Sequence, residues 1–142
     1  MLFVFQRVYR LLFQNHVKMH TVIIGIGSNI NASINIPKAM LLLAEIATVN
    51  CSSELITTKP IGITDQQDFT NASVNITTEL EADELREKLK SIEDKLGRDR
   101  TRAKFGPREI DLDIVVFDNE IIDDDYHTRD FLKTLVDTVW KK

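Results

Sequence analysis

Apolar residues recur along this chain with two different periods, which predict a mixture of strands and helices. An uninterrupted β-branched run at 21–27 is typical of a central strand that is buried on both faces. Residues 48–58 are rich in Thr, Val, Ser and Ile and predict a second strand. Residues 110–117 predict a further strand, and the polar residues 118–120 after it predict a turn.

Residues 69–78 alternate in character and predict a strand with two unlike faces. Val74 and Ile76 lie on one face, whereas Phe69 and Asn71 lie on the other. If the first face meets the helices, Phe69 and Asn71 are left on the side where a ligand could lie. Proline, glycine and polar residues just before this strand predict a loop.

Helical spacing of apolar residues predicts three helices. The first covers about 35–47, with Asn35 as its cap and Pro37 in its first turn. The second covers about 81–96, with acids in its first turn and Gly97 after its end. Its buried stripe is formed by Leu85, Leu89, Ile92 and Leu96. A terminal helix is supported by Phe131, Leu132, Leu135, Val136 and Val139.

The predicted order is strand, helix, strand, strand, helix, strand and a tail. This order predicts an α+β fold of the ferredoxin-like, split β-α-β type, an antiparallel sheet with helices on one face. The opposite face of the sheet would then carry a ligand cleft covered by loops.

The size and composition of the chain predict one domain over residues 21–142. At 142 residues, 43% of them hydrophobic, the chain can bury a core of its own, and no linker or repeat divides it. The single cysteine cannot form an internal disulfide, so a cytoplasmic location is expected.

Residues 1–20 differ from the rest because they are apolar and basic and contain no acid. They are too short and too often charged for a membrane-spanning helix, and they lack the pattern of a secretory signal. An organelle transit peptide, a surface helix, and an upstream start ahead of Met19 remain open.

Charge is concentrated in one segment, Gly97 to Arg108. Its five basic side chains and one acid give a net charge of +4, in a chain whose total is −4. A basic loop on an acidic body suits a small polyanion and its metal better than a nucleic acid. The basic residues are Arg98, Arg100, Arg102, Lys104 and Arg108.

Two carboxylates follow the basic segment directly. On a strand, Asp111 and Asp113 point to the same face, and a hard cation between them would relieve their repulsion. Either motif alone is usually only a solvated surface. Together they indicate Mg²⁺ and a nucleoside triphosphate, because arginines bind phosphate in a bidentate manner. The chain has no Gly-x-x-x-x-Gly-Lys-Ser/Thr loop, so P-loop chemistry is excluded.

These motifs resemble the signature of the 6-hydroxymethyl-7,8-dihydropterin pyrophosphokinase family. The resemblance covers about residues 21–122. The matching stretches are Gly97-Arg98-x-Arg100, Lys104-Phe105-Gly106-Pro107-Arg108-x-Ile110-Asp111-Leu112-Asp113-Ile114, Ile26-Gly27-Ser28-Asn29, Thr58-x-Pro60-Ile61-Gly62 and Gln66-x-Asp68-Phe69-x-Asn71.

The resemblance implies transfer of diphosphate from ATP to the hydroxymethyl group of the reduced pterin, with release of AMP. It implies that Asp111 and Asp113 hold two Mg²⁺ ions and act in catalysis with Arg98 and Arg108. The residues implied for the nucleotide are Glu93, Arg98, Arg100, Arg108, Ile114 and Arg129. Those implied for the pterin are Thr58, Ile61, Phe69, Asn71 and Phe131, the last stacking on its ring.

The chain departs from the family pattern after Asp118. Residues 123–131 are shorter than in the family, lack its Pro-His pair and add three acids, although Arg129 and Phe131 match its Arg-x-Phe. Weakened ATP binding is therefore expected, and a pterin- or nucleotide-binding relative without catalysis is the alternative. A third hypothesis, an RNA-binding ferredoxin-like domain, is disfavoured by the net charge of −4. The partners expected are small molecules, with no nucleic acid, no membrane and a monomeric state.

Overall fold

The computed structural model describes residues 17–141 of the chain. Residues 1–16, on which the prediction of an N-terminal extension mainly falls, lie outside the described residues. The helices are α2 (Ala32–Ile46), α3 (Ala82–Lys95), α4 (Asp125–Thr128) and α5 (Asp130–Val139). The strands are β1 (His20–Ser28), β2 (Thr48–Ser52), β3 (Ile56–Thr58), β4 (Phe69–Thr78), β5 (Asp111–Phe117) and β6 (Glu120–Ile121).

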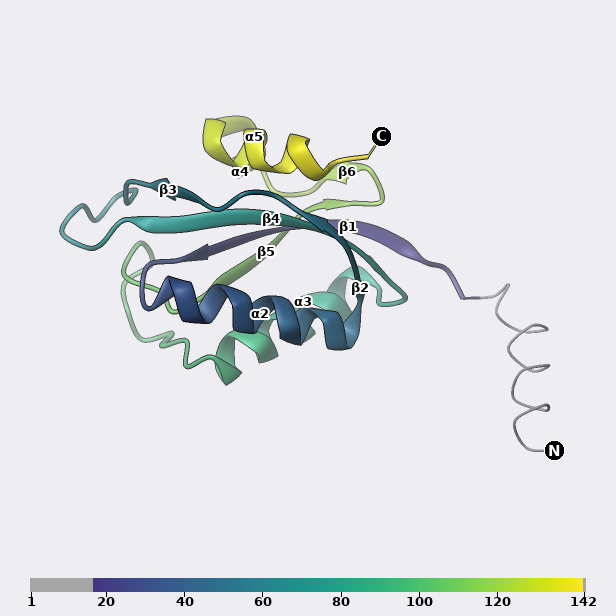
Figure 1. The fold of residues 1–142 in the computed structure, drawn as a ribbon, viewed down its shortest axis with the longest axis horizontal. Helices are drawn as coiled ribbons and strands as arrows, with labels where there is room; N and C mark the ends of the chain where they lie inside the picture. The colour runs from purple at the N-terminus through teal and green to yellow at the C-terminus, as the bar shows by residue number, and fades with distance from the viewer. Residues whose placement is uncertain (1–16, 142) are drawn as a thin grey trace.

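One antiparallel sheet forms the centre of the molecule, in the order β2-β4-β1-β5-β6, with β3 also paired to β4 (Figure 1). Strands β1 and β2 both run antiparallel to β4, so they point the same way and α2 connects them across it. In the same way α3 connects β4 to β5 across β1. This is the predicted split β-α-β arrangement, and the α+β fold class is confirmed.

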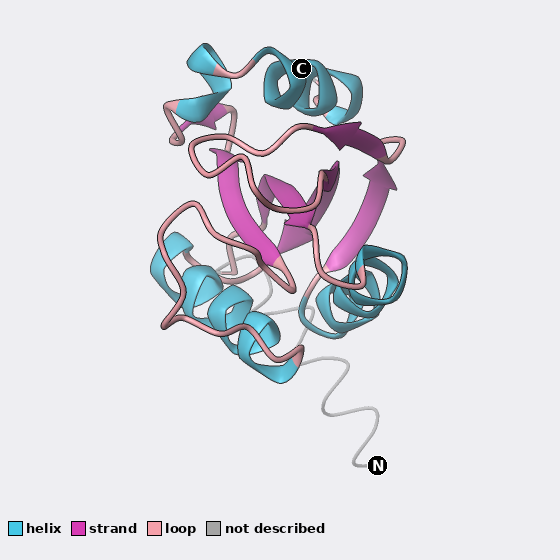
Figure 2. Ribbon diagram, turned by 90° about the vertical axis from the view of Figure 1, so that its left-hand side faces the viewer, coloured by secondary structure: helices cyan, strands magenta, loops and turns pink. Residues whose placement is uncertain are grey.

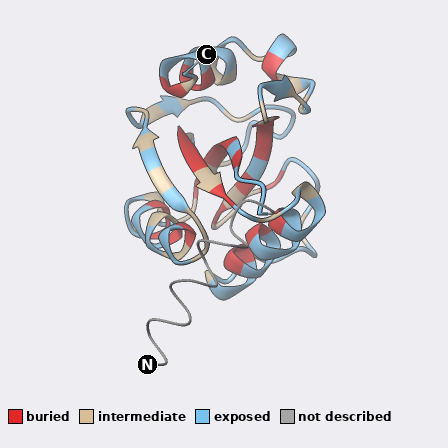
Figure 3. Ribbon diagram, turned by 90° about the vertical axis from the view of Figure 1, so that its right-hand side faces the viewer, coloured by how far each residue is buried: buried red, intermediate tan, exposed pale blue. Residues whose placement is uncertain are grey.

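Helices cover both faces of the sheet (Figure 2). On one face α2 and α3 pack on Val22, Ile24, Val74 and Ile76, which belong to the larger core. On the other face α5 places Val136 against Ile23 and Val115 in a second, smaller core. The terminal helix predicted from apolar spacing therefore covers part of the face that was expected to carry only loops. The buried residues gather on the central strands between these two layers (Figure 3).

Two predicted elements differ in detail. The first helix begins at Ala32, about one turn early, because Asn31 adopts a left-handed conformation (φ 47°) and its carbonyl accepts the first helical bonds. Asn35 thus lies inside the helix, and its side chain donates to the Ile30 carbonyl (2.7 Å). The second predicted strand is divided into β2 and β3, and both pieces pair with β4.

No helix in the described residues is long and apolar enough to cross a lipid bilayer.

A buried histidine joins three elements at the start of β1, the end of the strand opposite to Gly27 and Asp111. His20, only 2% exposed at the start of β1, donates Nδ1–H to Asp118 (2.5 Å) and Nε2–H to Glu81 (2.9 Å). Only an imidazolium can donate from both nitrogens. Its two hydrogen bonds, the one to Asp118 foremost, raise the pKa of His20 above its usual 6.5. The cluster ties the turn after β5 and the start of α3 to β1.

We predict that His20 makes the free energy of unfolding depend on pH. Below about pH 6.5 the imidazole is protonated in both states, and its two bonds stabilise the fold fully. As pH rises through the higher folded-state pKa, this stabilisation is lost. The melting-temperature advantage of the native chain over His20→Gln should therefore shrink, by roughly 2–5 °C, between about pH 6 and pH 9.

Thermal unfolding at a series of pH values measures this effect. His127→Gln provides a control, because His127 is exposed on α4 and its variant should keep the native pH profile. A constant difference between the native chain and His20→Gln across the range would contradict the prediction.

Candidate active site

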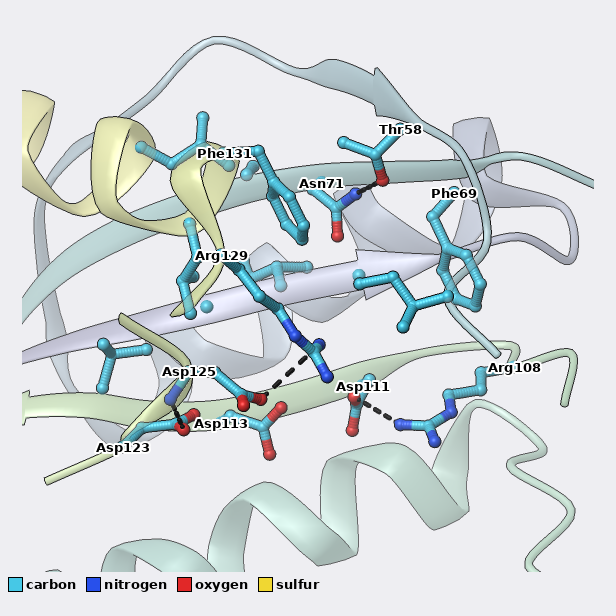
Figure 4. Close-up of a pocket in the computed structure, with 18 of the residues that line it drawn as sticks. Thr58, Phe69, Asn71, Arg108, Asp111, Asp113, Asp123, Asp125, Arg129 and Phe131 are labelled. Atoms are coloured by element: carbon cyan, nitrogen blue, oxygen red, sulfur yellow. Dashed lines mark hydrogen bonds and ion pairs between the residues drawn. The ribbon is translucent and has the colours of Figure 1, made fainter. Parts of the chain in front are cut away.

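The floor of the site lies on the two central strands. Asp111 and Asp113 are on β5, and the sheet register places them opposite Gly27 and Gly25 of β1. Because glycine has no side chain, space remains above β1 beside both carboxylates. A cavity of about 240 Å³ occupies this space, bordered by the strands, two loops and α5 (Figure 4). The two loops are loop 59–68 and the basic loop 97–110.

One end of the cavity is built by β3, loop 59–68, β4 and α5. It is lined by all of the residues predicted to contact a pterin, namely Thr58, Ile61, Phe69, Asn71 and Phe131. In Figure 4, Phe131 reaches down from α5 and Phe69 lies at the end of β4, with Asn71 between them along the strand. This end therefore combines aromatic rings with a single amide.

The amide of Asn71 is oriented by its neighbours. Its Nδ2 donates to Oγ1 of Thr58 (2.5 Å), which leaves Oδ1 facing the cavity floor at Gly27. A Cβ on Gly27 would lie only 3.0 Å from that oxygen, so glycine is what permits the approach. An oriented acceptor beside aromatic rings suits a flat heterocycle that carries N–H groups.

The other end of the cavity is charged. Arg108 donates from Nη1 to Oδ2 of Asp111 (2.7 Å), and Nη1 of Arg98 lies 3.4 Å from Oδ1 of the same carboxylate. Arg98 reaches this position because Gly97, with φ +87°, ends α3 in a Schellman-type turn. Both arginines of the basic loop that were predicted to act in catalysis therefore contact Asp111.

The charges around Asp113 are less favourable for a carboxylate than those around Asp111. Its carboxylate opens into the cavity, and in residues 17–141 no Lys or Arg forms an ion pair with it. Although Asp113 is exposed to the open cavity, desolvation by the surrounding protein and then the negative charge of Asp111 raise its pKa to about 8, and Asp123 and Glu93 add to the effect. A cation at this point would relieve the repulsion between the two carboxylates.

The donor set suits a hard divalent cation such as Mg²⁺. The described residues contain no group of three or more His, Cys, Asp or Glu side chains arranged to hold a metal. Mg²⁺ does not require such a cage, because it takes one or two carboxylates and completes its octahedron with water and phosphate oxygens. Asp111 and Asp113, beside an open cavity, meet that requirement.

A second, wider groove adjoins the cavity on the other side of the two aspartates. It runs between α3 and residues 122–124, and several residues predicted to contact a nucleotide lie in it. They are Glu93, Arg98, Arg100 and Ile114, whereas Arg108 and Arg129 line the first cavity. Arg102 turns away from both sites and pairs with Glu109 (2.7 Å).

The short segment after β5 still brings its two matching residues to the site. Helix α4 is fastened to α5 because the hydroxyl of Tyr126 donates to Asp137 (2.6 Å). The chain then turns so that Arg129 and Phe131 both line the cavity, and Arg129 lies 3.5 Å from Asp125. The loss of residues in this segment therefore does not remove Arg129 or Phe131 from the site.

Asn29 and Gln66 were not predicted as site residues, although they organise both loops. Nδ2 of Asn29 donates to Oε1 of Gln66 and to the Gln67 carbonyl (both 2.9 Å), while its Oδ1 accepts from the backbone N–H of Arg108 (2.8 Å). Gln66 in turn donates to the Phe105 carbonyl (2.6 Å). Both residues belong to the matching motifs, which could have marked them as site residues. Their hydrogen-bond partners could not be predicted, because these lie far away in the sequence.

Comparison with known families now identifies the chain. The 7,8-dihydro-6-hydroxymethylpterin-pyrophosphokinase family matches residues 23–139, which include most of β1, all of β5, both loops and α5. The chain belongs to this family. The resemblance predicted from the motifs is confirmed, and the match extends through the short segment that departs from the usual pattern.

Three relatives are named 2-amino-4-hydroxy-6-hydroxymethyldihydropteridine pyrophosphokinase. The Haemophilus influenzae protein is 34% identical over 125 residues, which cover 80% of this chain and 78% of that protein. The Bacillus subtilis protein is 40% identical over 103 residues, covering 70% of this chain and 61% of the relative. The Aquifex aeolicus protein is 38% identical over 105 residues, covering 73% of this chain and 65% of that relative. The chain thus spans less than two thirds of two of these pyrophosphokinases.

We predict that the pair of carboxylates in this pyrophosphokinase-family site destabilises the chain when no metal is bound. Folding raises the pKa of Asp113 to about 8, so near pH 8 the folded chain bears the cost of a carboxyl whose ionisation is suppressed; Asp113→Asn cannot ionise and should raise the melting temperature by roughly 3–6 °C. Mg²⁺ should then stabilise the native chain more than the variant, as calorimetry with and without the ion would measure. The matched control is Asp83→Asn, an exposed acid in the first turn of α3 that pairs only weakly with Arg86, so this variant should melt within about 2 °C of the native chain and respond equally to Mg²⁺. A less stable Asp113→Asn, or equal stabilisation by Mg²⁺, would count against this interpretation.

Proposed function

We propose that this chain transfers the β,γ-diphosphate of ATP to the hydroxymethyl oxygen of 6-hydroxymethyl-7,8-dihydropterin and releases AMP, a step of folate biosynthesis. The observation that carries the proposal is one cavity with an aromatic, amide-bearing end and a carboxylate- and arginine-bearing end. Membership of the family and the names of the three relatives support the same reaction.

The aromatic end suits the pterin. Its ring would lie against Phe69 and Phe131, and Oδ1 of Asn71 would accept a hydrogen bond from a ring N–H or amino group. Thr58 holds that amide in place, and Ile61 adds an apolar wall. The hydroxymethyl group would then point along the floor toward the two aspartates.

The charged end suits the triphosphate and Mg²⁺. Asp111 and Asp113 would hold two Mg²⁺ ions, which when bound neutralise charge on the phosphate oxygens. Arg98 and Arg108 both contact the Asp111 carboxylate. Phosphate oxygens would give these two guanidinium groups a second anionic partner. Arg129 stands on the α5 side of the same space.

The adjoining groove suits the rest of the nucleotide. Its floor includes Ile114 of β5, its α3 wall carries Glu93, and Arg98 and Arg100 project from the basic loop. A nucleotide lying in the groove would reach the pterin cavity past Asp111 and Asp113, which line both spaces.

The reaction needs orientation more than proton transfer. The hydroxymethyl oxygen forms a bond to the β-phosphorus while the bond between that phosphorus and the bridging oxygen of the α-phosphate breaks, and the hydroxyl proton is released. AMP leaves with the bridging oxygen. Holding both substrates in line and stabilising the charge on phosphate supply most of the rate in such transfers. The residues described above would perform both tasks.

The alternative of a binding relative without catalysis is not favoured, because Arg129 and Phe131 still line the cavity despite the short segment. An RNA-binding function is also disfavoured, since α5 covers the sheet face that such domains use for stacking bases. The same proposal includes a monomer that acts on small molecules in the cytoplasm.

The direct test of this function is release of AMP from ATP. We predict AMP formation that requires Mg²⁺ and the reduced pterin together and that falls about a thousandfold or more in Asp111→Ala and Asp113→Ala. Chromatographic detection of AMP measures it, and Asp83→Ala, an exposed acid on α3, should leave the rate unchanged. The proposal fails if the native chain forms no more AMP than the double aspartate variant.

Gly27→Ala tests the pterin end separately. The added methyl group would lie 3.0 Å from Oδ1 of Asn71 and push the amide out of position. Affinity for the reduced pterin should drop about tenfold, the loss of roughly one hydrogen bond, while ATP binding stays the same. Calorimetry on Gly27→Ala, Asn71→Ala and the double variant measures this.

The double variant provides the control, because without the Asn71 amide the methyl group has nothing polar to displace. The fold-loss of pterin affinity in the double variant should be smaller than the product of the fold-losses in the two single variants. Fully multiplicative losses would show that Gly27 acts in some other way.

A further inference from the structure

Glu93 is a buried carboxylate whose two oxygens are both engaged by the protein. It lies in the last turn of α3 and is 6% exposed. Its Oε2 accepts from the backbone N–H of Leu112 (2.7 Å), and its Oε1 accepts from Nη2 of Arg100 (2.9 Å). A buried charge is costly unless it is hydrogen-bonded or paired, and these two partners give each oxygen a donor.

The hydrogen bond from the Leu112 N–H goes to a side chain and not to a neighbouring strand. One edge of β5 pairs with β1, and β6 continues the sheet at Val116 and Phe117, which lie beyond Leu112. The Leu112 N–H therefore meets a side chain on α3 instead of a strand. Leu112 stands between Asp111 and Asp113, so this bond fixes the stretch of backbone from which both carboxylates project.

The second oxygen holds the basic loop. Besides the Arg100 bond, Oε1 lies 3.6 Å from Nη1 of Arg98, and the Glu93 carbonyl accepts from the backbone N–H of Arg98 (3.1 Å). Arg98 continues to the Ile110 carbonyl (2.9 Å) and to Asp111. One residue thus connects the end of α3, the two arginines and the strand that bears the aspartates.

We propose that Glu93 is a positioning residue, which sets the distance between the arginines of the basic loop and the Asp111–Asp113 pair by holding Arg100 and the Leu112 amide at once. The proposal rests on the proposed function for the reaction that this spacing serves. It assigns to Glu93 a role through its protein partners, because both carboxylate oxygens already accept hydrogen bonds from the protein.

Two substitutions separate the two contacts. Glu93→Met is similar in length and has no good acceptor, so both contacts are lost. Glu93→Gln keeps an amide oxygen for Leu112 but presents N–H groups, which cannot accept from Arg100. Hydrogen exchange of the Leu112 amide, followed by NMR without substrates, should speed up about tenfold or more in Glu93→Met and stay near native in Glu93→Gln.

Kinetics should follow the same order. Glu93→Met should lower kcat about 10–100-fold, the usual effect of removing a group that orients metal ligands, and Glu93→Gln should lose less. KM for the pterin should not change in either variant. Because Glu93→Gln already breaks the contact between Glu93 and Arg100, adding Arg100→Gln should cost less than it does in the native chain.

Asp94→Asn is the matched control. Asp94 is the next residue on α3 and also contacts Arg100 (3.0 Å), but it is 60% exposed and does not contact Leu112. Its loss should change kcat by less than about threefold. The proposal is overturned if Leu112 exchange is unchanged in Glu93→Met, if Arg100→Gln costs the same in both backgrounds, or if Asp94→Asn matches Glu93→Met. If the native chain formed no AMP, the proposed function would fail. Hydrogen exchange at the Leu112 amide would still test the role of Glu93.

Discussion

The antiparallel pairing of β1 with β5 is the constraint on which the site depends. Its register sets each aspartate across from a glycine, so two carboxylates stand beside a strip of strand without side chains. A one-residue shift in register would turn Asp111 and Asp113 into the core and bring Leu112 to the surface. The hydrophobic core under the sheet, with Leu112 and Ile114 in it, resists that shift. The core therefore fixes the polar chemistry above it.

The two aspartates differ in the charges that surround them. Asp111 is balanced by two arginines of the basic loop, while Asp113 is left beside other carboxylates. The free chain therefore keeps one carboxylate satisfied and one unfavourable, and this asymmetry favours binding of a cation together with a phosphate. Such unfavourable charge is tolerated because the two cores, one on each face of the sheet, supply the stability.

Local patterns predicted much of this structure because they reflect local forces. Strand β4 has the predicted bounds, Gly97 ends α3 with a positive φ, and Phe69 and Asn71 face the ligand side. The start of α2 was placed one turn late because Asn31, not Asn35, supplies the left-handed residue before the helix. The basic loop and the two aspartates could be recognised from the sequence because they lie next to each other on one short stretch of chain.

Other features depend on residues that are distant in sequence, and no local pattern reports them. The Asn29 amide contacts Arg108 across 79 positions, and His20 contacts Asp118 across 98. The packing of α5 on the second face depends on the same kind of contact, with Ser73 and Asn75 of β4 donating to its carbonyls. Periodicity predicted that this helix exists but not which layer it joins.

Helix α5 serves two purposes within ten residues. Its first turn carries Phe131 into the cavity, and its later turns close the second core with Val136 and Val139. The helix cannot swing away to admit a substrate without uncovering that core. Entry is thereby left to the loops on the other rim of the cavity, so the side from which ligands arrive is decided by the packing of the C-terminal helix.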